Sequence, residues 1–279
     1  MGNHYIPQYY LRGFEQMGRI WVFDSRSGHT FESQAKSIAN ENDMYPKELE
    51  ELLANDIEAP ANGVLSRLRD FQAPTETDKA LLAKYMFVLW KRVPKGRARA
   101  RKQTAKVADQ VHLELQTELD ALAKSDPSKA KVVTEGKARI AEVIERRKLG
   151  DNSDIWHLAI PDASPRILDA MLSMHWVYLY HDTLQFLTCD NPVCFFEREG
   201  LASPKAELLF PISSAIALLA TRTRQFTDEF ISAKPAGVKE MNRRIAKNAE
   251  RFVYFKKNEP WIEPFITKGD WRISRVHND

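Results

Sequence analysis

The chain has 279 residues and a formal net charge of +3 at pH 7, a length that supports one large domain or two small ones. Its content of 43% hydrophobic and 28% charged residues is typical of globular proteins and excludes a disordered chain. No run approaches the roughly 18 apolar residues of a transmembrane helix, and the first residues lack a signal-peptide pattern, so no membrane partner is expected. Two cysteines, Cys189 and Cys194, exclude a disulfide scaffold and favour a cytoplasmic location.

The first expected elements are a short helix and a hairpin. Pro7 suits the first position of a helix and Gly13 the position just after its end, which predicts a helix over 7–12. Residues 20–24 and 30–33 are rich in β-branched and aromatic side chains. They predict two antiparallel strands joined by a turn.

A helical section is expected at about 47–150. Residues 47–69 have apolar side chains at helical spacing. Pro60 and Gly63 are expected to kink or divide this helix.

Further helices follow along the same section. Thr75 and Asp78 form a capping-box pattern in front of a strongly apolar helix. A turn or kink is expected at 94–96. Long polar helices are then predicted over 97–123 and 131–149.

The composition changes from about residue 151. Short runs of β-branched and aromatic residues predict strands, with one helix over 238–250; the strands are expected over 176–180, 185–189, 193–196, 208–212, 215–220 and 252–255. The fold class is therefore α+β, with an N-terminal hairpin, a C-terminal mostly antiparallel sheet and a long helical middle. We expect a single domain over 1–279, in which the hairpin joins the C-terminal sheet.

The opening segment carries a dense set of chemical groups. The imidazole of His4 titrates near neutral pH and is a candidate for proton transfer. Gln8 is a candidate to orient a substrate, and Arg12 to bind a carboxylate or phosphate through two hydrogen bonds. In the alternative interpretation, His4 and Arg12 only anchor the segment to the body of the protein.

Asp190 and Asn191 follow a predicted strand and precede Pro192. Pro192 restricts Asn191 to an extended conformation. Asp190 then lies at a strand end, where a rigid scaffold often presents functional groups. Asp190 is thus a candidate catalytic residue and Asn191 a candidate substrate ligand. The alternative is a hairpin corner, because Asp and Asn side chains hydrogen-bond within their own turns.

Glu58 interrupts an otherwise apolar helix face, so an internal partner is expected, either Arg12 or Arg92. With His4 and Asp190 it also forms a hypothetical carboxylate and imidazole cluster. Such a cluster suits a divalent metal, Mg or Mn, of the kind that phosphodiester hydrolysis uses.

Two further sets of residues are candidates for binding anions. Asn242 is predicted to lie on a helix beside two arginines. The segment from Lys91 to Lys106 contains no acidic residue and is a candidate to contact phosphates, through Lys95, Arg97, Arg99, Arg101 and Lys102. In both cases the alternative is a solvated helix face.

Three stretches of sequence resemble the bacterial family called domain of unknown function 4238. They are His4-x-x-Pro7-Gln8-x-Tyr10-Leu11-Arg12-x-Phe14, then Asp190-Asn191-Pro192-Val193 followed by Phe210-Pro211-Ile212-Ser213, and Asn242 with Ala246 and Ala249 leading into Arg251-Phe252-Val253-Tyr254. The resemblance spans nearly the whole chain. It implies a prokaryotic cytoplasmic protein and brings no established activity, cofactor or ligand.

These observations suggest functions from different classes. The first is a nuclease-like phosphodiester hydrolase acting on RNA or DNA, with His4, Glu58 and Asp190 as catalytic residues and Arg12 and Arg92 as phosphate ligands. The second is a non-catalytic module of a defence or stress system, which binds nucleic acid, a protein partner or a second copy of the chain. A small-molecule enzyme with a pocket between the helical middle and the sheet is the third.

Overall fold

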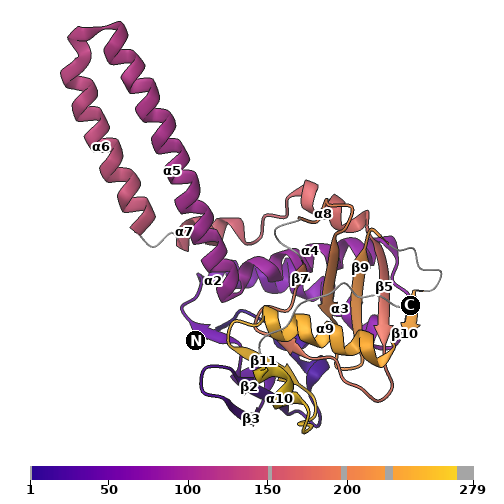
Figure 1. The fold of residues 1–279 in the computed structure, drawn as a ribbon. Coiled ribbons are helices and arrows are strands. Elements are labelled where there is room, and N and C mark those ends of the chain that lie inside the picture. Colours follow the sequence, from indigo (N-terminus) through magenta and orange to yellow (C-terminus); the bar gives the residue numbers. More distant parts are fainter. Residues whose placement is uncertain (1, 150–152, 196–199, 224–228, 269–279) are drawn as a thin grey trace. The chain divides into compact units, whose positions relative to one another are not determined.

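The computed structural model describes residues 2–149, 153–195, 200–223 and 229–268. The chain divides into two compact units, one formed by Met1–Lys95 with Ile160–Asp279 and the other by Gly96–Ala159. Its class is α+β, as the sequence predicts, with antiparallel sheets and a long helical region (Figure 1). No described helix combines the length and the apolar character needed to cross a membrane.

The first unit begins with the short elements that carry the opening motif. They are β1 (Gly2–His4), α1 (Gln8–Leu11), a 3-10 turn (Arg12–Phe14), β2 (Ile20–Asp24), β3 (His29–Ser33) and β4 (Asn40–Asn42). The predicted hairpin is present as the antiparallel pair β2 and β3. The predicted helix is also present, and its last turn tightens into the 3-10 turn, a common way for a helix to end.

The helices of the first unit are α2 (Lys47–Leu52), α3 (Ala59–Arg69), α4 (Glu76–Arg92), α8 (Pro165–Leu172), α9 (Pro235–Asn248) and α10 (Ile262–Thr267). A π-helical stretch, Leu53–Glu58, separates α2 from α3 just before Pro60. Proline has no N–H to donate into the helix, which accounts for the predicted interruption. The predicted capping box of α4 is present, since Thr75 and Asp78 each bond the other's backbone N–H.

The strands of the C-terminal part are β5 (His175–Tyr180), β6 (Thr188–Cys189), β7 (Cys194–Phe195), β8 (Glu207–Pro211), β9 (Ile216–Thr221), β10 (Phe230–Ser232) and β11 (Phe252–Phe255). One sheet has the order β10-β5-β9-β8-β7, and only its pair β10 and β5 is parallel. A second sheet has the order β3-β2-β11-β6. The N-terminal hairpin therefore joins the C-terminal strands through β2 and β11, as expected.

An ion pair reinforces the junction between β2 and β11. Arg251 donates from Nε and Nη2 to the two carboxylate oxygens of Asp24, over 2.9 and 2.6 Å. Two parallel bonds of this kind are the strongest geometry for an arginine and a carboxylate. The hydrogen bonds from Arg251 lower the pKa of Asp24.

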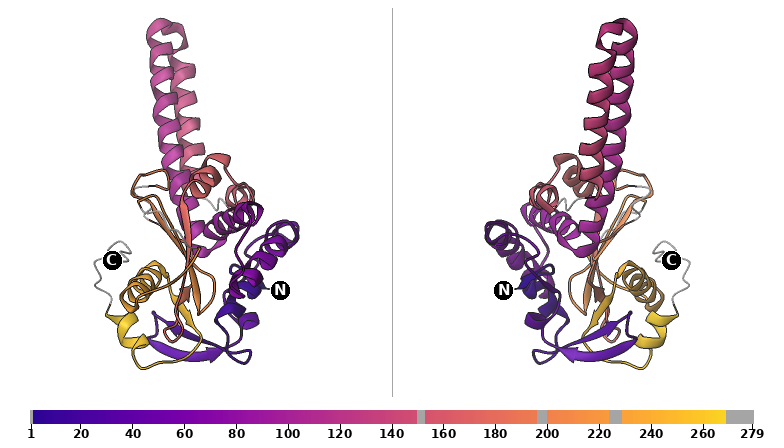
Figure 2. Two further views of the ribbon diagram at one scale, coloured as in Figure 1. Left: turned by 90° about the vertical axis from the view of Figure 1, so that its right-hand side faces the viewer. Right: turned by 90° about the vertical axis from the view of Figure 1, so that its left-hand side faces the viewer.

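Helices cover both faces of the five-stranded sheet. Figure 2 shows α9 on one side of the strands and the N-terminal helices on the other. Alternate residues of each strand face α9, because side chains in a strand alternate between faces. The buried cluster on this side includes Val177, Leu179, Ala217, Leu219, Val238, Met241 and Ile245.

The second unit is a helical hairpin. It contains most of α5 (Pro94–Ser125), then a 3-10 turn (Pro127–Lys129), α6 (Ala130–Leu149) and α7 (Ser153–Ala159). The ion pairs Asp109 with Lys148 and Asp120 with Lys137 join α5 to α6. The turn or kink expected at 94–96 lies just before those residues, because the chain breaks at the extended residue Val93 and α5 already begins at Pro94. Proline favours the first turn of a helix, where its missing N–H is not needed.

Two glycines offer a matched test of packing around the opening motif. A Cβ atom at Gly13 would lie 2.6 Å from Nη2 of Arg69 and 2.8 Å from the carbonyl oxygen of Ile212, whereas one at Gly63 would meet only Arg67 at 3.6 Å. We expect Gly13→Ala to lower the free energy of unfolding by about 1–3 kcal/mol. Gly63→Ala should raise it by about 0.5–1 kcal/mol, because Ala suits a helix interior. Urea unfolding measures both, and a stable Gly13→Ala protein would contradict the packing described.

Candidate functional site

The opening motif contacts the strand that precedes Asp190 through its tyrosines. The hydroxyl of Tyr10 lies 2.7 Å from Oγ1 of Thr188 in β6, and its ring stacks on Phe210 with centroids 5.1 Å apart. Tyr5 is buried. Burial raises its pKa and the nearby charge of Asp190 raises it further. The two signature stretches are therefore neighbours in the fold.

The remaining groups of the motif have separate environments. His4 is half-buried, and Nε2 of its imidazole lies 3.2 Å from the carbonyl oxygen of Lys36. Gln8 is half-buried and Arg12 is exposed. One arginine that anchors the motif is Arg69 on α3, which donates to the carbonyl oxygens of Tyr9, Tyr10 and Ile212. Sequence reasoning missed Arg69, whose only local signal is its place in the last turn of a helix.

Arg92 is the centre of a buried network. Its side chain is 2% exposed, pairs with Glu58 and donates to the carbonyl oxygen of His4. It also donates to the hydroxyl of Tyr45 over 2.6 Å, and that hydroxyl donates to the same carbonyl over 2.9 Å. Burial opposes the charge of Arg92, but Tyr45 and Glu58 outweigh this effect and raise its pKa. Of the two partners expected for Glu58, the structure pairs it with Arg92.

Asp190 organises the connection between α9 and β11. Its carboxylate accepts the backbone N–H groups of Glu250, Arg251 and Phe252 over 2.7, 2.7 and 2.9 Å. The side chain is 5% exposed. Burial raises the pKa of Asp190, while the three backbone bonds act in the opposite direction. The carboxylate thus takes up three donors that a loop would otherwise leave unpaired.

Asn191 and Lys95 meet at the end of α9. Nδ2 of Asn191 donates to the carbonyl oxygen of Asn248 over 3.3 Å. Asn248 donates back to the carbonyl oxygens of Asn191 and Val193 over 2.6 and 3.2 Å. Nζ of Lys95 donates to the same Asn248 carbonyl over 3.1 Å. Asn248, which sequence reasoning missed, therefore links one predicted substrate ligand to one predicted nucleic-acid ligand.

Asn242 joins α9 to the segment before β6. Its Oδ1 accepts the N–H of Leu187 over 2.9 Å, and its Nδ2 donates to the carbonyl oxygen of Gln185 over 2.9 Å. These bonds take the place of backbone hydrogen bonds that a neighbouring strand would make with Gln185 and Leu187. They explain why the strand expected over 185–189 shortens to β6.

The arginines beside Asn242 also have partners within the protein. Arg243 pairs with Glu240. Arg244 is buried and pairs with Glu207 over 2.8 Å and with Glu240 over 3.5 Å. The contacts favour a structural role for this helix face over an anion site.

The structure brings only part of the expected catalytic set together. Glu58 and Arg92 are in contact, and His4 joins them through its backbone carbonyl rather than its imidazole. Asp190 lies in a separate set of bonds. Within the described ranges, no group of three or more His, Cys, Asp or Glu side chains is placed to hold a metal ion.

The basic segment of α5 combines engaged and exposed cations. The guanidinium of Arg97 lies over the ring of Trp156, 5.7 Å from its centroid. Arg99 is half-buried, whereas Arg101 and Lys102 are exposed. Lys106, one turn further along the helix, is exposed as well.

Comparison with known proteins gives a family but no annotated relative. Searches of curated proteins and of solved structures give no significant match. A family model described as protein of unknown function (DUF4238) matches residues 3–259. The matched region contains all three signature stretches, from the opening motif to β11. The chain therefore belongs to the DUF4238 family.

Proposed function

We propose that this protein is a nucleic-acid-binding module that contacts the phosphate backbone through α5 without hydrolysing it. The observation that carries this proposal is the exposed group of Arg101, Lys102 and Lys106, which we call the α5 basic patch. It lies in a segment, from Lys91 to Lys106, that contains no acidic residue. Cations arranged in this way bind a polyanion independently of base sequence.

The charge pattern of α5 supports an external anionic partner. Lys102 and Lys106 are four residues apart and share one helix face, where like charges destabilise a helix by a few tenths of a kcal/mol. Further along the helix, Asp109 and Asp120 have lysine partners on α6. The charges of the hairpin are thus balanced beyond residue 108 and unbalanced before it.

The contacts of the expected catalytic residues favour binding over catalysis. A general acid or base must reach the proton that it transfers. The carboxylate of Asp190 is filled by three backbone donors, and Glu58 is paired with a buried arginine. A role in a defence or stress system, and a cytoplasmic location where RNA and DNA are accessible, remain part of the proposal.

The test measures binding of short RNA and DNA oligonucleotides by fluorescence anisotropy between about 50 and 200 mM salt. Affinity should fall steeply with salt, because bound cations release counterions from the phosphates. The variant Arg101→Gln/Lys102→Gln/Lys106→Gln should bind more weakly. Its logarithmic salt slope should be smaller by about 2–3, close to one for each lost contact.

A matched control separates the α5 basic patch from net charge. Lys124→Gln/Lys129→Gln/Lys131→Gln removes the same charge from exposed positions at the other end of the hairpin, and should leave the slope unchanged. Equal effects of the two triple variants, or no binding at low salt, would contradict the proposal. Cleavage of the oligonucleotides in the presence of Mg or Mn would contradict its non-catalytic part.

A further inference from the structure

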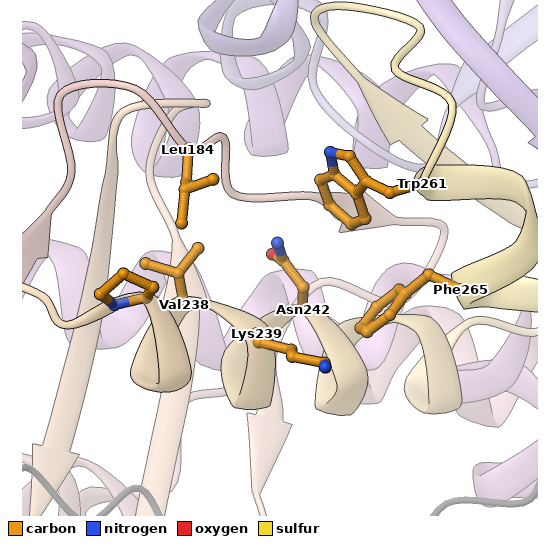
Figure 3. A pocket seen from close by; sticks show the side chains of 7 residues that line it. Leu184, Val238, Lys239, Asn242, Trp261 and Phe265 are labelled. Carbon is orange, nitrogen blue, oxygen red and sulfur yellow. The ribbon is translucent and has the colours of Figure 1, made fainter.

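A cavity of about 340 Å³ opens beside α9. Its lining residues are far in sequence from the α5 basic patch. Its lining includes Leu184, Val238, Lys239, Asn242, Trp261 and Phe265 (Figure 3). The volume lies within the range of small-molecule sites, which are mostly apolar with a few polar groups. Asn242, from the third signature stretch, is part of this lining, and the proposed function leaves the cavity unexplained.

The aromatic wall of the cavity has a fixed geometry. The rings of Trp261 and Phe265 meet edge to face, with centroids 5.5 Å apart and planes at 79°. Nε1 of Trp261 donates to Glu259 over 2.7 Å, and Gln185 donates to the same carboxylate oxygen over 3.0 Å. Because the hydrogen bond to Glu259 and the contact with Phe265 fix the indole, the cavity offers a preformed surface for a flat ring.

The polar part of the cavity is a single cation. Among the described residues that line the cavity, Lys239 is the only charged one. Its side chain is exposed, and it extends from α9 at the same cavity as Phe265 (Figure 3). Asn242 is already engaged with the backbone of Gln185 and Leu187. One cation at the edge of an aromatic wall is complementary to one anionic group on an apolar ligand.

We infer that this cavity binds a small planar aromatic carboxylate, with its ring against Trp261 and Phe265 and its carboxylate on Lys239. Leu184 and Val238 would contact the opposite side of the ring. A single lysine at a solvated edge matches one negative charge better than the nearly two charges of a phosphate monoester. The inference stands independently of nucleic-acid binding.

The test uses calorimetric titration of the full chain with naphthoate and with naphthamide, which has the same ring and no charge. Naphthoate should bind about three to five times more tightly, the effect of one ion pair at a partly exposed site. Lys239→Met keeps most of the side-chain stem and should abolish this preference, leaving naphthamide binding unchanged. Lys234→Met, an exposed lysine outside the cavity lining, is the matched control and should keep the preference.

A second variant tests the location. Leu184 is half-buried, and Leu184→Trp should occupy part of the cavity and weaken binding of both compounds at an unchanged melting temperature. The inference is overturned if neither compound binds to the unmodified chain, if both bind equally, or if Leu184→Trp leaves both affinities unchanged. Binding only by a chain that ends at Lys268 would assign the cavity to residues 269–279 and would also overturn it.

Discussion

Replacing Arg92 by methionine is expected to lower the free energy of unfolding by about 3–5 kcal/mol, the usual cost of breaking a buried ion pair from one side. The substitution leaves Glu58 without its cation and removes a donor from both Tyr45 and the carbonyl of His4. Urea or thermal unfolding measures the loss. Arg101→Met, at an exposed position on α5, is the control and should change stability by no more than about 0.5 kcal/mol.

A double-mutant cycle separates the ion pair from the rest of the network. Adding Glu58→Leu to Arg92→Met removes the unpaired carboxylate, so the double variant should be more stable than Arg92→Met alone. Strictly additive losses would show that Glu58 and Arg92 are not coupled. That result would contradict the arrangement that holds the opening motif in place.

The substitution Asp190→Asn is expected to lower the free energy of unfolding by about 2–4 kcal/mol. The carboxylate accepts three backbone N–H groups, and an amide turns a donor toward some of them, leaving buried donors unpaired. Chemical unfolding at neutral pH measures the cost. Asp182→Asn, in an exposed loop position of the same region, should be nearly neutral.

The difference in stability between the unmodified protein and Asp190→Asn should depend on pH, with a sign that follows from the pKa of Asp190. Because burial raises the pKa of Asp190, the folded protein binds this proton more tightly than the unfolded chain does. The contribution of Asp190 to stability is therefore greatest below the unfolded pKa of about 3.9 and falls as pH rises through the folded pKa. The gap between the unmodified protein and Asp190→Asn should shrink as the pH rises from about 4 through the folded pKa of Asp190. A gap that widens over this interval would mean that the folded pKa is lowered.

The local elements of the fold could be predicted because their signals lie within a few residues of one another. The capping box of Thr75 and Asp78 and the hairpin of β2 and β3 depend on such short-range patterns. The strands around residue 190 are shorter than expected because Asn242 and Asn248, more than fifty residues away, take hydrogen bonds that a neighbouring strand would otherwise make. No periodicity in the strands themselves carries that information.

In the candidate site, too, short-range patterns could be predicted and long-range contacts could not. Arg92 and Asp190 could be singled out from the sequence, but their partners come from distant parts of the chain. Tyr10 meets Thr188 across 178 positions, and Arg92 meets the carbonyl of His4 across 88. Arg69 gave no signal beyond its place in the last turn of a helix, because its partners are backbone carbonyls, which every residue carries. A catalytic role for His4, Glu58 and Asp190 stays a prediction from the sequence.

The pairing of β2 with β11 has a consequence for how the protein is made. Asp24 and Arg251 are 227 positions apart, so the N-terminal hairpin leaves the ribosome long before the strand that completes its sheet. Contacts of such high sequence separation slow folding and leave strand edges open in the meantime. We therefore expect assembly of this sheet to be a late, post-translational step, with the nascent hairpin dependent on chaperones until then.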